Sequence, residues 1–264
     1  MSKFNDKKVL ITGGCSGIGL IMARKSLERG ASRVIIWDIN QKAIDAVVEE
    51  LSKIGAIEGY CVDISSSEAV LNTASEVGPI DILINNAGIV VGKSFADHSI
   101  AEIDRTININ TSGAMYVTKA FLGGMITTNQ GHICNIASSA GYVANPNMSV
   151  YAASKWAVVG WSDSVRIELK RSKSAVRITT IMPYFINTGM FDGVKSRIPI
   201  LKPEVAAEKI IRSIEKNAKL RSIYGILYPF TRTIQGLLPL CCFDFVADKM
   251  FGIYDTMKEF KGRK

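Results

Sequence analysis

The stretch Val9-Leu10-Ile11-Thr12-Gly13-Gly14-Cys15-Ser16-Gly17-Ile18-Gly19 decides the fold of this chain. It begins with a short apolar run that predicts a buried strand, turns through several glycines, and continues into a segment with helical spacing over residues 18–29. Such a turn holds backbone N–H groups and the positive end of a helix dipole where they can bind a pyrophosphate. The glycines at 13, 17 and 19 are more widely spaced than in the commonest dinucleotide fingerprint, and a purely structural turn is the alternative. The rest of the chain therefore has to supply the context.

Short apolar runs alternate with segments of helical spacing along the chain. Runs of this kind are typical of parallel strands that are buried on both faces. The expected strands cover residues 9–11, 34–37, 59–62, 80–84, 133–136 and 178–182, and the expected helices cover 18–29, 41–54, 67–77, 110–125 and 154–170. This alternation predicts an α/β fold, a Rossmann-type doubly wound parallel sheet with helices on both faces.

The part that follows Pro203 is harder to interpret. It predicts a helix over residues 203–217, a possible final strand over 223–227, and an apolar, helical C-terminal extension over 228–264. Prolines and charges interrupt any membrane span there, so the extension is a substrate lid, a subunit contact or a surface that rests on lipid. Residues 189–203 are expected to form a mobile substrate lid. Because no linker or repeat divides the chain, residues 1–264 are predicted to form one domain.

Composition excludes several classes of protein. The excess of positive charge, +8 in total, is concentrated at residues 170–173 and in the C-terminal Lys258, Lys261, Arg263 and Lys264. A basic helix end and a solvated tail explain these two groups of charges. No aromatic residues are interleaved with them, as a nucleic-acid-binding surface would require. The five cysteines lack metal-ligand spacing, so no metal site is expected. The cysteines are expected to be buried free thiols. With no signal segment and no span, the expected location is the cytoplasm, either in solution or peripheral to a membrane.

Asp38 ends the second predicted strand, about 20 residues beyond the glycines. A carboxylate at this point accepts hydrogen bonds from the adenosine ribose hydroxyls and repels a 2′-phosphate, which favours NAD over NADP. The alternative is an acidic residue at the start of the helix that begins at Gln41. Arg33 precedes the strand and is poorly placed to bind a phosphate.

Tyr151 and Lys155 stand four residues apart at the start of a helical segment, so both side chains project from one face. An adjacent ammonium favours the phenolate and lowers the pKa of the phenol toward a value useful for acid/base chemistry. Ser138 leaves a strand at its carboxyl end, where α/β folds bind ligands, and its hydroxyl can donate to a substrate carbonyl, whereas Ser139 is expected to pack or cap. Asn110 lies within a predicted helix, where it could simply bond backbone or water.

Taken together, these motifs resemble the short-chain dehydrogenase/reductase family. The resemblance rests on Thr12 to Gly19, Asn85-Asn86-Ala87-Gly88, Asn110-Thr111-Ser112-Gly113, Ser138, and Tyr151-Ala152-Ala153-Ser154-Lys155, and it spans nearly the whole chain. It implies that Tyr151 is the acid/base, that Lys155 lowers its pKa and holds the ribose, that Ser138 orients the reacting oxygen, and that Asn110 holds a water in the proton relay. With the residue arguments above, the expected NAD-binding residues are Gly13, Cys15, Ser16, Gly17, Ile18, Gly19, Asp38, Asp63, Ile64, Asn86, Ala87, Gly88, Tyr151, Lys155, Pro183, Ile186 and Thr188.

One departure from the family pattern is visible. The usual Pro-Gly after the sixth strand reads Pro183-Tyr184 here, so the backbone beside the nicotinamide is expected to differ in detail, although Thr188 still matches.

The sequence also resembles the branch that contains epidermal retinol dehydrogenases and lipid-droplet 17β-hydroxysteroid dehydrogenases, which implies a lipophilic alcohol or ketone as substrate. A hydroxysteroid or bile acid is the first expectation, retinol or a long-chain alcohol the second, and a non-catalytic, lipid-associated NAD-binding scaffold the alternative of another class. The expected apolar pocket is formed by Val143, Met148, Tyr184, Phe185, Met190 and Phe191. The family resemblance implies a homodimer or homotetramer. The absence of the hydrophobic N-terminal anchor common in this branch leaves only peripheral membrane contact, through the C-terminal tail, as an expectation.

Overall fold

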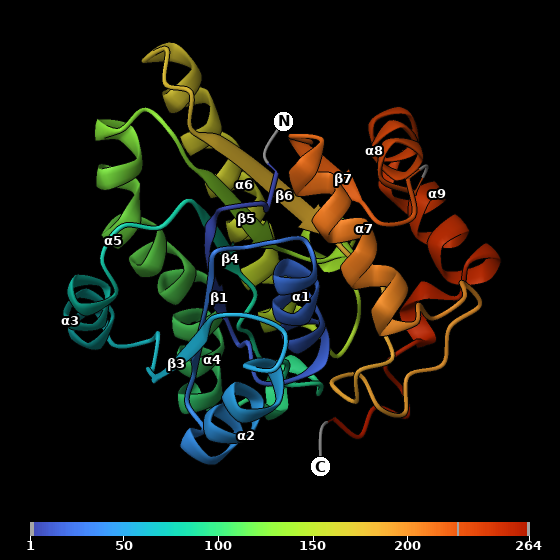
Figure 1. Ribbon diagram of the computed structural model, residues 1–264. Helices are drawn as coiled ribbons and strands as arrows, with labels where there is room; N and C mark the ends of the chain where they lie inside the picture. The colour runs from blue at the N-terminus through green and yellow to red at the C-terminus, as the bar shows by residue number, and fades with distance from the viewer. Residues whose placement is uncertain (1–2, 226, 263–264) are drawn as a thin grey trace.

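A computed structural model describes residues 3–225 and 227–262, and within them seven strands form one sheet (Figure 1). The strands are β1 (Lys8–Thr12), β2 (Arg33–Asp38), β3 (Ile57–Cys61), β4 (Ile82–Asn85), β5 (His132–Ile136), β6 (Arg177–Met182) and β7 (Leu220–Ser222). Their order is β3-β2-β1-β4-β5-β6-β7, and every neighbouring pair is parallel. The predicted doubly wound parallel sheet is confirmed. Arg263 and Lys264 of the predicted basic tail lie outside the described residues.

The central strands are apolar throughout because each contributes side chains to two cores. In β1, Val9 and Ile11 point into one core and Leu10 into the other. This alternation follows from the two-residue repeat of a strand, and each such buried side chain stabilises the fold by roughly 1.5–3 kcal/mol relative to exposure. The alternation fixes the pairing register, since a shift of one residue would exchange the two faces.

Helices cover both faces of the sheet (Figure 1). On one face lie α1 (Gly17–Glu28), α2 (Gln41–Leu51) and α7 (Pro203–Glu215), and on the other α3 (Ser67–Val77), α5 (Ala114–Thr127) and α6 (Ser149–Arg171), with α4 (Ile100–Ile107) packed beside α6. Because the strands are parallel, their carboxyl ends meet at one edge of the sheet, and this edge positions the site.

Two predicted elements differ from the structure. The helix expected over 110–125 is α5 preceded by a separate π-helical turn, Asn108–Gly113, because the Asn110 side chain is bonded to the loop after β4. The final strand is β7 rather than residues 223–227. As an edge strand it exposes Arg221 and lacks the apolar run of a central strand, whereas the more apolar Ile223 packs in the core after the strand has ended.

The C-terminal extension is helical, as predicted. It consists of α8 (Leu227–Leu237), α9 (Leu240–Phe245), a π-helical turn (Val246–Met250) and a 3₁₀ turn (Ile253–Asp255), which lie beside β7 at one edge of the sheet (Figure 1). No helix of residues 3–225 and 227–262 is both long enough and apolar enough to cross a membrane.

The cysteines are all free thiols, but the expectation that they are buried holds only for Cys15 and Cys134. Cys61 is exposed because it ends the outer strand β3. Cys241 and Cys242 are exposed because they lie in the first turn of α9, next to its junction with α8. The expectation came from the general tendency of free cysteines to be buried, and it fails for these three residues because of where they lie in the fold.

Candidate active site

The glycine-rich turn is held tightly against the loop that follows β4. The Thr12 hydroxyl accepts the backbone N–H groups of Asn86 (3.0 Å) and Ala87 (3.1 Å), and the Asn86 amide donates to the carbonyl oxygens of Thr12 (3.0 Å) and Gly13 (3.1 Å). A Cβ on Gly19 would lie 2.1 Å from the Gly13 carbonyl oxygen, so the first turn of α1 can approach this loop only without a side chain. The role of Thr12 was not predicted; its full burial at the end of a strand is the feature that accounts for it.

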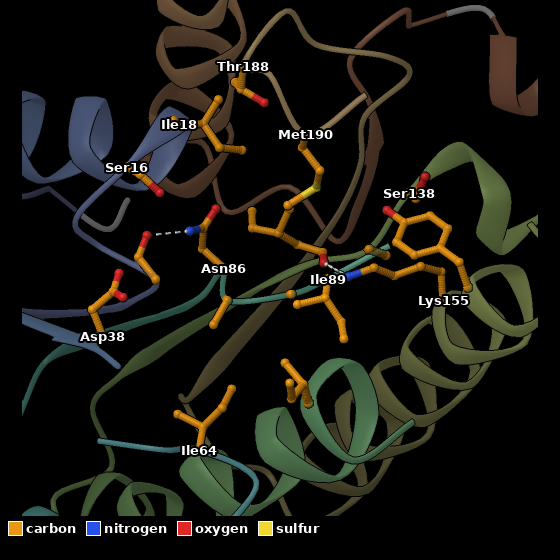
Figure 2. A pocket seen from close by; sticks show the side chains of 18 of the residues that line it. Ser16, Ile18, Asp38, Ile64, Asn86, Ile89, Ser138, Lys155, Thr188 and Met190 are labelled. Carbon is orange, nitrogen blue, oxygen red and sulfur yellow. Dashed lines mark hydrogen bonds between the residues drawn. The ribbon is translucent and has the colours of Figure 1, made fainter. Parts of the chain in front are cut away.

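A cleft of about 500 Å³ opens at the carboxyl ends of the strands (Figure 2). Among the residues expected to bind cofactor, those that line it are Gly13, Ser16, Gly17, Ile18, Asp38, Asp63, Ile64, Asn86, Ala87, Gly88, Tyr151, Lys155, Pro183, Ile186 and Thr188. Figure 2 shows Asp38 at one end and Ser138 with Lys155 at the other. Cys15, Gly19 and Asn110 are not among the residues that line the cleft; they support the loops around it.

Several lining residues were missed by the sequence reasoning. Trp37, Ile39, Val62, Ser65, Ile89, Arg105, Ile109, Ile136 and Ala137 all face the cleft. Most directly adjoin predicted residues, so the rule that ligands bind beyond the carboxyl ends of parallel strands would have found them. Arg105 comes from α4 and carried no sequence signal.

The Asp38 carboxylate is fixed at the end of β2. Its Oδ2 accepts the Cys15 N–H at 3.2 Å, and its Oδ1 accepts the N–H of Ile39 at 2.9 Å. The alternative role as a helix cap falls to Asn40, whose side chain accepts the Ala43 N–H at 3.1 Å. Burial, reinforced by the Asp38 charge, raises the pKa of the Cys15 thiol to about 12, so this thiol stays neutral.

Ser138, Tyr151 and Lys155 meet at the opposite end of the cleft. Ser138 Oγ accepts the Ala140 N–H at 3.1 Å, which leaves the hydroxyl proton available for donation. The Lys155 ammonium donates to the Ile136 carbonyl oxygen at 3.0 Å and lies 5.7 Å from the centre of the Tyr151 ring. Tyr151 and Lys155 are both buried, on neighbouring turns of α6. A hydrogen-bonding hydroxyl, a phenol and an ammonium therefore converge on one point beside the cleft.

Comparison with known proteins assigns the chain. The short chain dehydrogenase family model matches residues 7–198. The chain belongs to the short-chain dehydrogenase/reductase family. It is therefore an oxidoreductase of the alcohol dehydrogenase/ketone reductase type, dependent on a nicotinamide cofactor.

Individual relatives are similar over most of their length. Epidermal retinol dehydrogenase 2 of Mus musculus is 36% identical, with 97% of this chain and 85% of that protein covered. Short-chain dehydrogenase/reductase 3 of Homo sapiens is 33% identical over 97% and 87%, and 17-beta-hydroxysteroid dehydrogenase 13 of Mus musculus is 32% identical over 80% and 72%. The retinol/hydroxysteroid dehydrogenase branch expected from the sequence is confirmed.

Solved structures agree on the fold. A short-chain dehydrogenase/reductase from Burkholderia phymatum in complex with NAD superposes with a TM-score of 0.81 at 24% identity, over 88% of this chain and 94% of that one. A metagenomic short-chain oxidoreductase in complex with NADP gives a TM-score of 0.70 at 28% identity, over 84% and 96%. The first of these proteins was solved with NAD and the second with NADP.

Burial dominates the electrostatics of the reductase site. It raises the pKa of Tyr151 to about 12, against the opposing effect of a hydrogen bond with Ser138, and it lowers the pKa of Lys155 to about 8. In this arrangement the Lys155 ammonium is directed to the Ile136 carbonyl oxygen, and its expected effect on the pKa of Tyr151 stays a prediction. The phenol is therefore a proton donor as it stands, and it needs a nearby positive charge to act as a base.

Asn110 lies behind the reacting groups, in the π-helical turn. Its Oδ1 accepts the Ile89 N–H at 2.8 Å, and its Nδ2 donates to the Ile89 carbonyl oxygen at 2.9 Å and to Ser154 Oγ at 3.0 Å. These bonds fix the loop after β4 against α6. Asn110 therefore bonds backbone, which is one of the two alternatives that the sequence left open, and it positions the loop. Its role in holding a water stays a prediction.

The expected apolar pocket is largely assembled. A second cavity of about 40 Å³ adjoins Ser138 and is lined by Val143, Met148, Tyr184, Phe185 and Phe191, whereas Met190 lines the larger cleft instead. The Phe191 ring lies 5.9 Å from the Tyr151 ring and contributes to both cavities.

Tyr184, which replaces the family's usual glycine, also lines both cavities, and its hydroxyl is bonded to Ser196 Oγ at 2.9 Å. The departure after Pro183 therefore places an aromatic wall between the cofactor cleft and the apolar cavity.

Proposed function

We propose that this short-chain dehydrogenase/reductase interconverts a lipophilic secondary alcohol and its ketone with NAD, a hydroxysteroid or bile acid being the first candidate substrate. The observation that carries the proposal is the position of Ser138, which lines both the cofactor cleft and a cavity of apolar and aromatic side chains, with Tyr151 lining the same end of the cleft. A polar reacting group is thereby joined to an apolar binding region, as a lipophilic alcohol requires.

The cleft fits a dinucleotide. The glycine turn leaves no room for a Cβ at Gly19, which allows backbone N–H groups to approach a pyrophosphate, and Asp38 lies where an adenosine ribose would present its hydroxyls. The Asp38 carboxylate would also oppose a 2′-phosphate, and Arg33, at the opposite end of β2, is paired with Glu58 and does not line the cleft. These contacts support NAD rather than NADP for this chain.

The chain's own residues can manage the proton. When bound, the nicotinamide accepts or supplies the hydride. In the oxidation direction Ser138 orients the substrate hydroxyl and Tyr151 takes its proton; in reduction Tyr151 returns it. Lys155 holds the nicotinamide ribose and, once its ammonium turns toward Tyr151, stabilises the phenolate.

Retinol or a long-chain alcohol is the second candidate. It is supported by a relative named as a retinol dehydrogenase, which is 36% identical, whereas the relative named as a 17-beta-hydroxysteroid dehydrogenase is 32% identical. A third possibility, of another class, is a scaffold that binds the cofactor without turnover. The presence of both hydroxyls and of Lys155 in one site argues against it.

The test is the formation of reduced nicotinamide from NAD, and separately from NADP, with hydroxysteroids, bile acids, retinol and long-chain alcohols. Selective turnover of a hydroxysteroid with NAD supports the proposal. Turnover of retinol alone keeps the chemistry and replaces the substrate. Cofactor binding without turnover on any substrate, in both directions, favours the scaffold.

Assembly and location belong to the same proposal. We infer a homodimer or homotetramer, with the exposed Trp156 and Ile167 of α6 and Tyr116 of α5 as candidate contact residues. Light scattering after size-exclusion chromatography measures the assembly. A cytoplasmic chain with peripheral membrane contact is the location proposed, and its contact surface can be specified further.

A further inference from the structure

The corner between α8 and α9, residues 236–242, is an exposed apolar surface. Leu237 and Leu240 are 76% and 75% exposed, among the largest values for any large apolar side chain of the described residues. No charged residue occurs from Thr233 to Phe243. Phe245 (63% exposed) and Met250 (64% exposed) extend the surface beyond the corner. Figure 1 shows that α8 and α9 lie at the margin of the molecule, beyond β7. A concentrated exposed apolar surface of this kind marks a contact site.

The inner faces of the same helices line apolar cavities that lead toward the reacting groups. A third cavity, of about 30 Å³, lies between α8 and α9 and is lined by Phe230, Phe243 and Phe251 among others. It shares Leu227, Thr231 and Ile253 with the second cavity, which reaches Ser138. Phe230 is 46% exposed, so one wall of this series of cavities also belongs to the outer surface.

Charge around the corner favours an anionic partner over a neutral or cationic one. Arg232 and Arg197 are exposed, and Arg197 donates to the carbonyl oxygens of Lys249 and Met250 beside the apolar surface. The nearby carboxylates are already engaged: Asp244 accepts the Tyr254 hydroxyl at 2.6 Å, and Asp248 pairs with Lys249 at 2.7 Å. Apolar side chains bordered by cations are the pattern by which a protein rests on anionic lipid.

We propose that the α8–α9 corner docks on a lipid bilayer containing anionic phospholipid, and that the lipophilic substrate enters from this surface between α8 and α9. Leu237 and Leu240 insert among the acyl chains, and the arginines contact the headgroups. The substrate then reaches Ser138 past Leu227, Thr231 and Ile253, which line both small cavities. The entry route rests on the proposed function, whereas docking itself does not.

The docking experiment uses the full chain with sedimenting vesicles of phosphatidylcholine, with and without phosphatidylserine. The parent is expected to co-sediment, more strongly with phosphatidylserine, and added salt should remove that increment. Leu237→Asp combined with Leu240→Asp should lower the partition coefficient at least about tenfold, because two apolar side chains no longer enter lipid. Leu71→Asp, at a leucine of α3 that is 55% exposed, is the matched control and should stay within about twofold.

Three outcomes overturn docking on lipid. The parent fails to bind either vesicle, the double variant binds as strongly as the parent, or the α3 control loses binding as much as the double variant. If the parent binds no vesicle and the double variant abolishes self-association, the corner belongs to a contact with a second copy of the chain.

The entry route is tested with two substrates for one enzyme. The double variant should lose most of its rate on a lipophilic alcohol held in vesicles and keep its kcat on a water-soluble alcohol in free solution. Equal loss on both overturns the route. If the parent oxidises no alcohol at all, the proposed function fails, and the sedimentation result still decides whether the corner docks on lipid.

Discussion

Tyr151 combines burial with reactivity. Its ring packs against Phe191 and its pKa is raised to about 12, so the hydroxyl is protonated throughout the physiological range. A proton donor of this kind suits ketone reduction directly. Alcohol oxidation needs the phenolate, so its rate should rise with pH through the alkaline range, as Tyr151 releases its proton.

Replacing Tyr151→Phe removes only the hydroxyl and keeps the ring contact with Phe191. Turnover should fall by roughly a hundred- to ten-thousand-fold, the usual contribution of a positioned acid/base group. Affinity for reduced cofactor, followed by fluorescence titration, should change little. Tyr60→Phe, at a partly buried tyrosine of β3 that does not line the cleft, is the control and should retain full activity. Substantial activity in the Tyr151 variant would refute its assigned role.

Asp38 is the residue that we propose to govern the choice between the two cofactors. Removing its carboxylate in Asp38→Ala takes away both the ribose acceptor and the repulsion of a 2′-phosphate, so the ratio of kcat/KM for NADP to that for NAD should rise at least about tenfold. Asp45→Ala on α2, where the carboxylate is bonded to Gln41, is the charge-matched control. A parent that already prefers NADP would contradict the ribose argument before any variant is made.

At the scale of elements, the sequence predicts what depends on repeated local patterns. The central strands were recognisable because both of their faces are buried, and α1 because it follows the glycine turn. β7 and the π-helical turn were not recognisable. The first is a three-residue edge strand without an apolar run, and the second depends on a bond between Asn110 and Ile89, 21 residues apart. Motif spacing identified most of the cleft because most of its lining residues lie in or beside motifs that follow a strand. It missed Arg105 because the position of this residue depends on how α4 packs.

The predicted lid over residues 189–203 is fastened at both ends. A bridge between Ile186 and Leu201 closes its base, and the C-terminal tail crosses it, with Lys261 N–H donating to the Asp192 carbonyl oxygen at 2.9 Å. Gly193 lies under this tail at a φ of +83°, and a Cβ there would come within 2.1 Å of the Glu259 carbonyl oxygen. Tail and lid are therefore packed together, and the ring of Phe191 in the lid lies 6.5 Å from the ring of Phe260 in the tail.

Gly193→Ala should separate the tail from the lid. Because the lid then no longer holds Phe191 against Tyr151, KM for the lipophilic substrate should rise about fivefold or more, with a smaller change in kcat, and limited proteolysis within 189–203 should accelerate. Gly189→Ala is a close control, since Gly189 has a φ of +82° and open space around it. Similar effects from both substitutions would attribute the change to backbone strain rather than to contact with the tail.

At the scale of the whole molecule, the two cores share one sheet, and β5 lies between them. The prediction that residues 1–264 form one domain implies that both cores unfold together. A single transition in denaturant, coincident by fluorescence and circular dichroism, is the expected result.

The stability of this unit should depend on His132, at the start of β5. The side chain is 1% exposed and its Nε2 lies 2.8 Å from Thr179 Oγ1 of β6. Burial, with the charge of Arg177 as the lesser cause, lowers the pKa of His132 from 6.5 to about 4. In this pH range the unfolded chain binds more protons than the folded one, so stability is complete above about pH 6.5 and is lost as the pH falls toward 4.

The free energy of unfolding should therefore fall by on the order of 2 to 3 kcal/mol between these pH values through this residue alone. His132→Asn removes the titrating group, so the variant's denaturation midpoint should fall less steeply with acid than that of the parent, whatever its stability at neutral pH. His98→Asn, at the other histidine of the chain, in the loop before α4, is the matched control. Parallel acid profiles for the parent and His132→Asn would show that the buried imidazole does not cause the loss of stability in acid. The pH dependence of the free energy of unfolding would then be assigned to carboxylates instead.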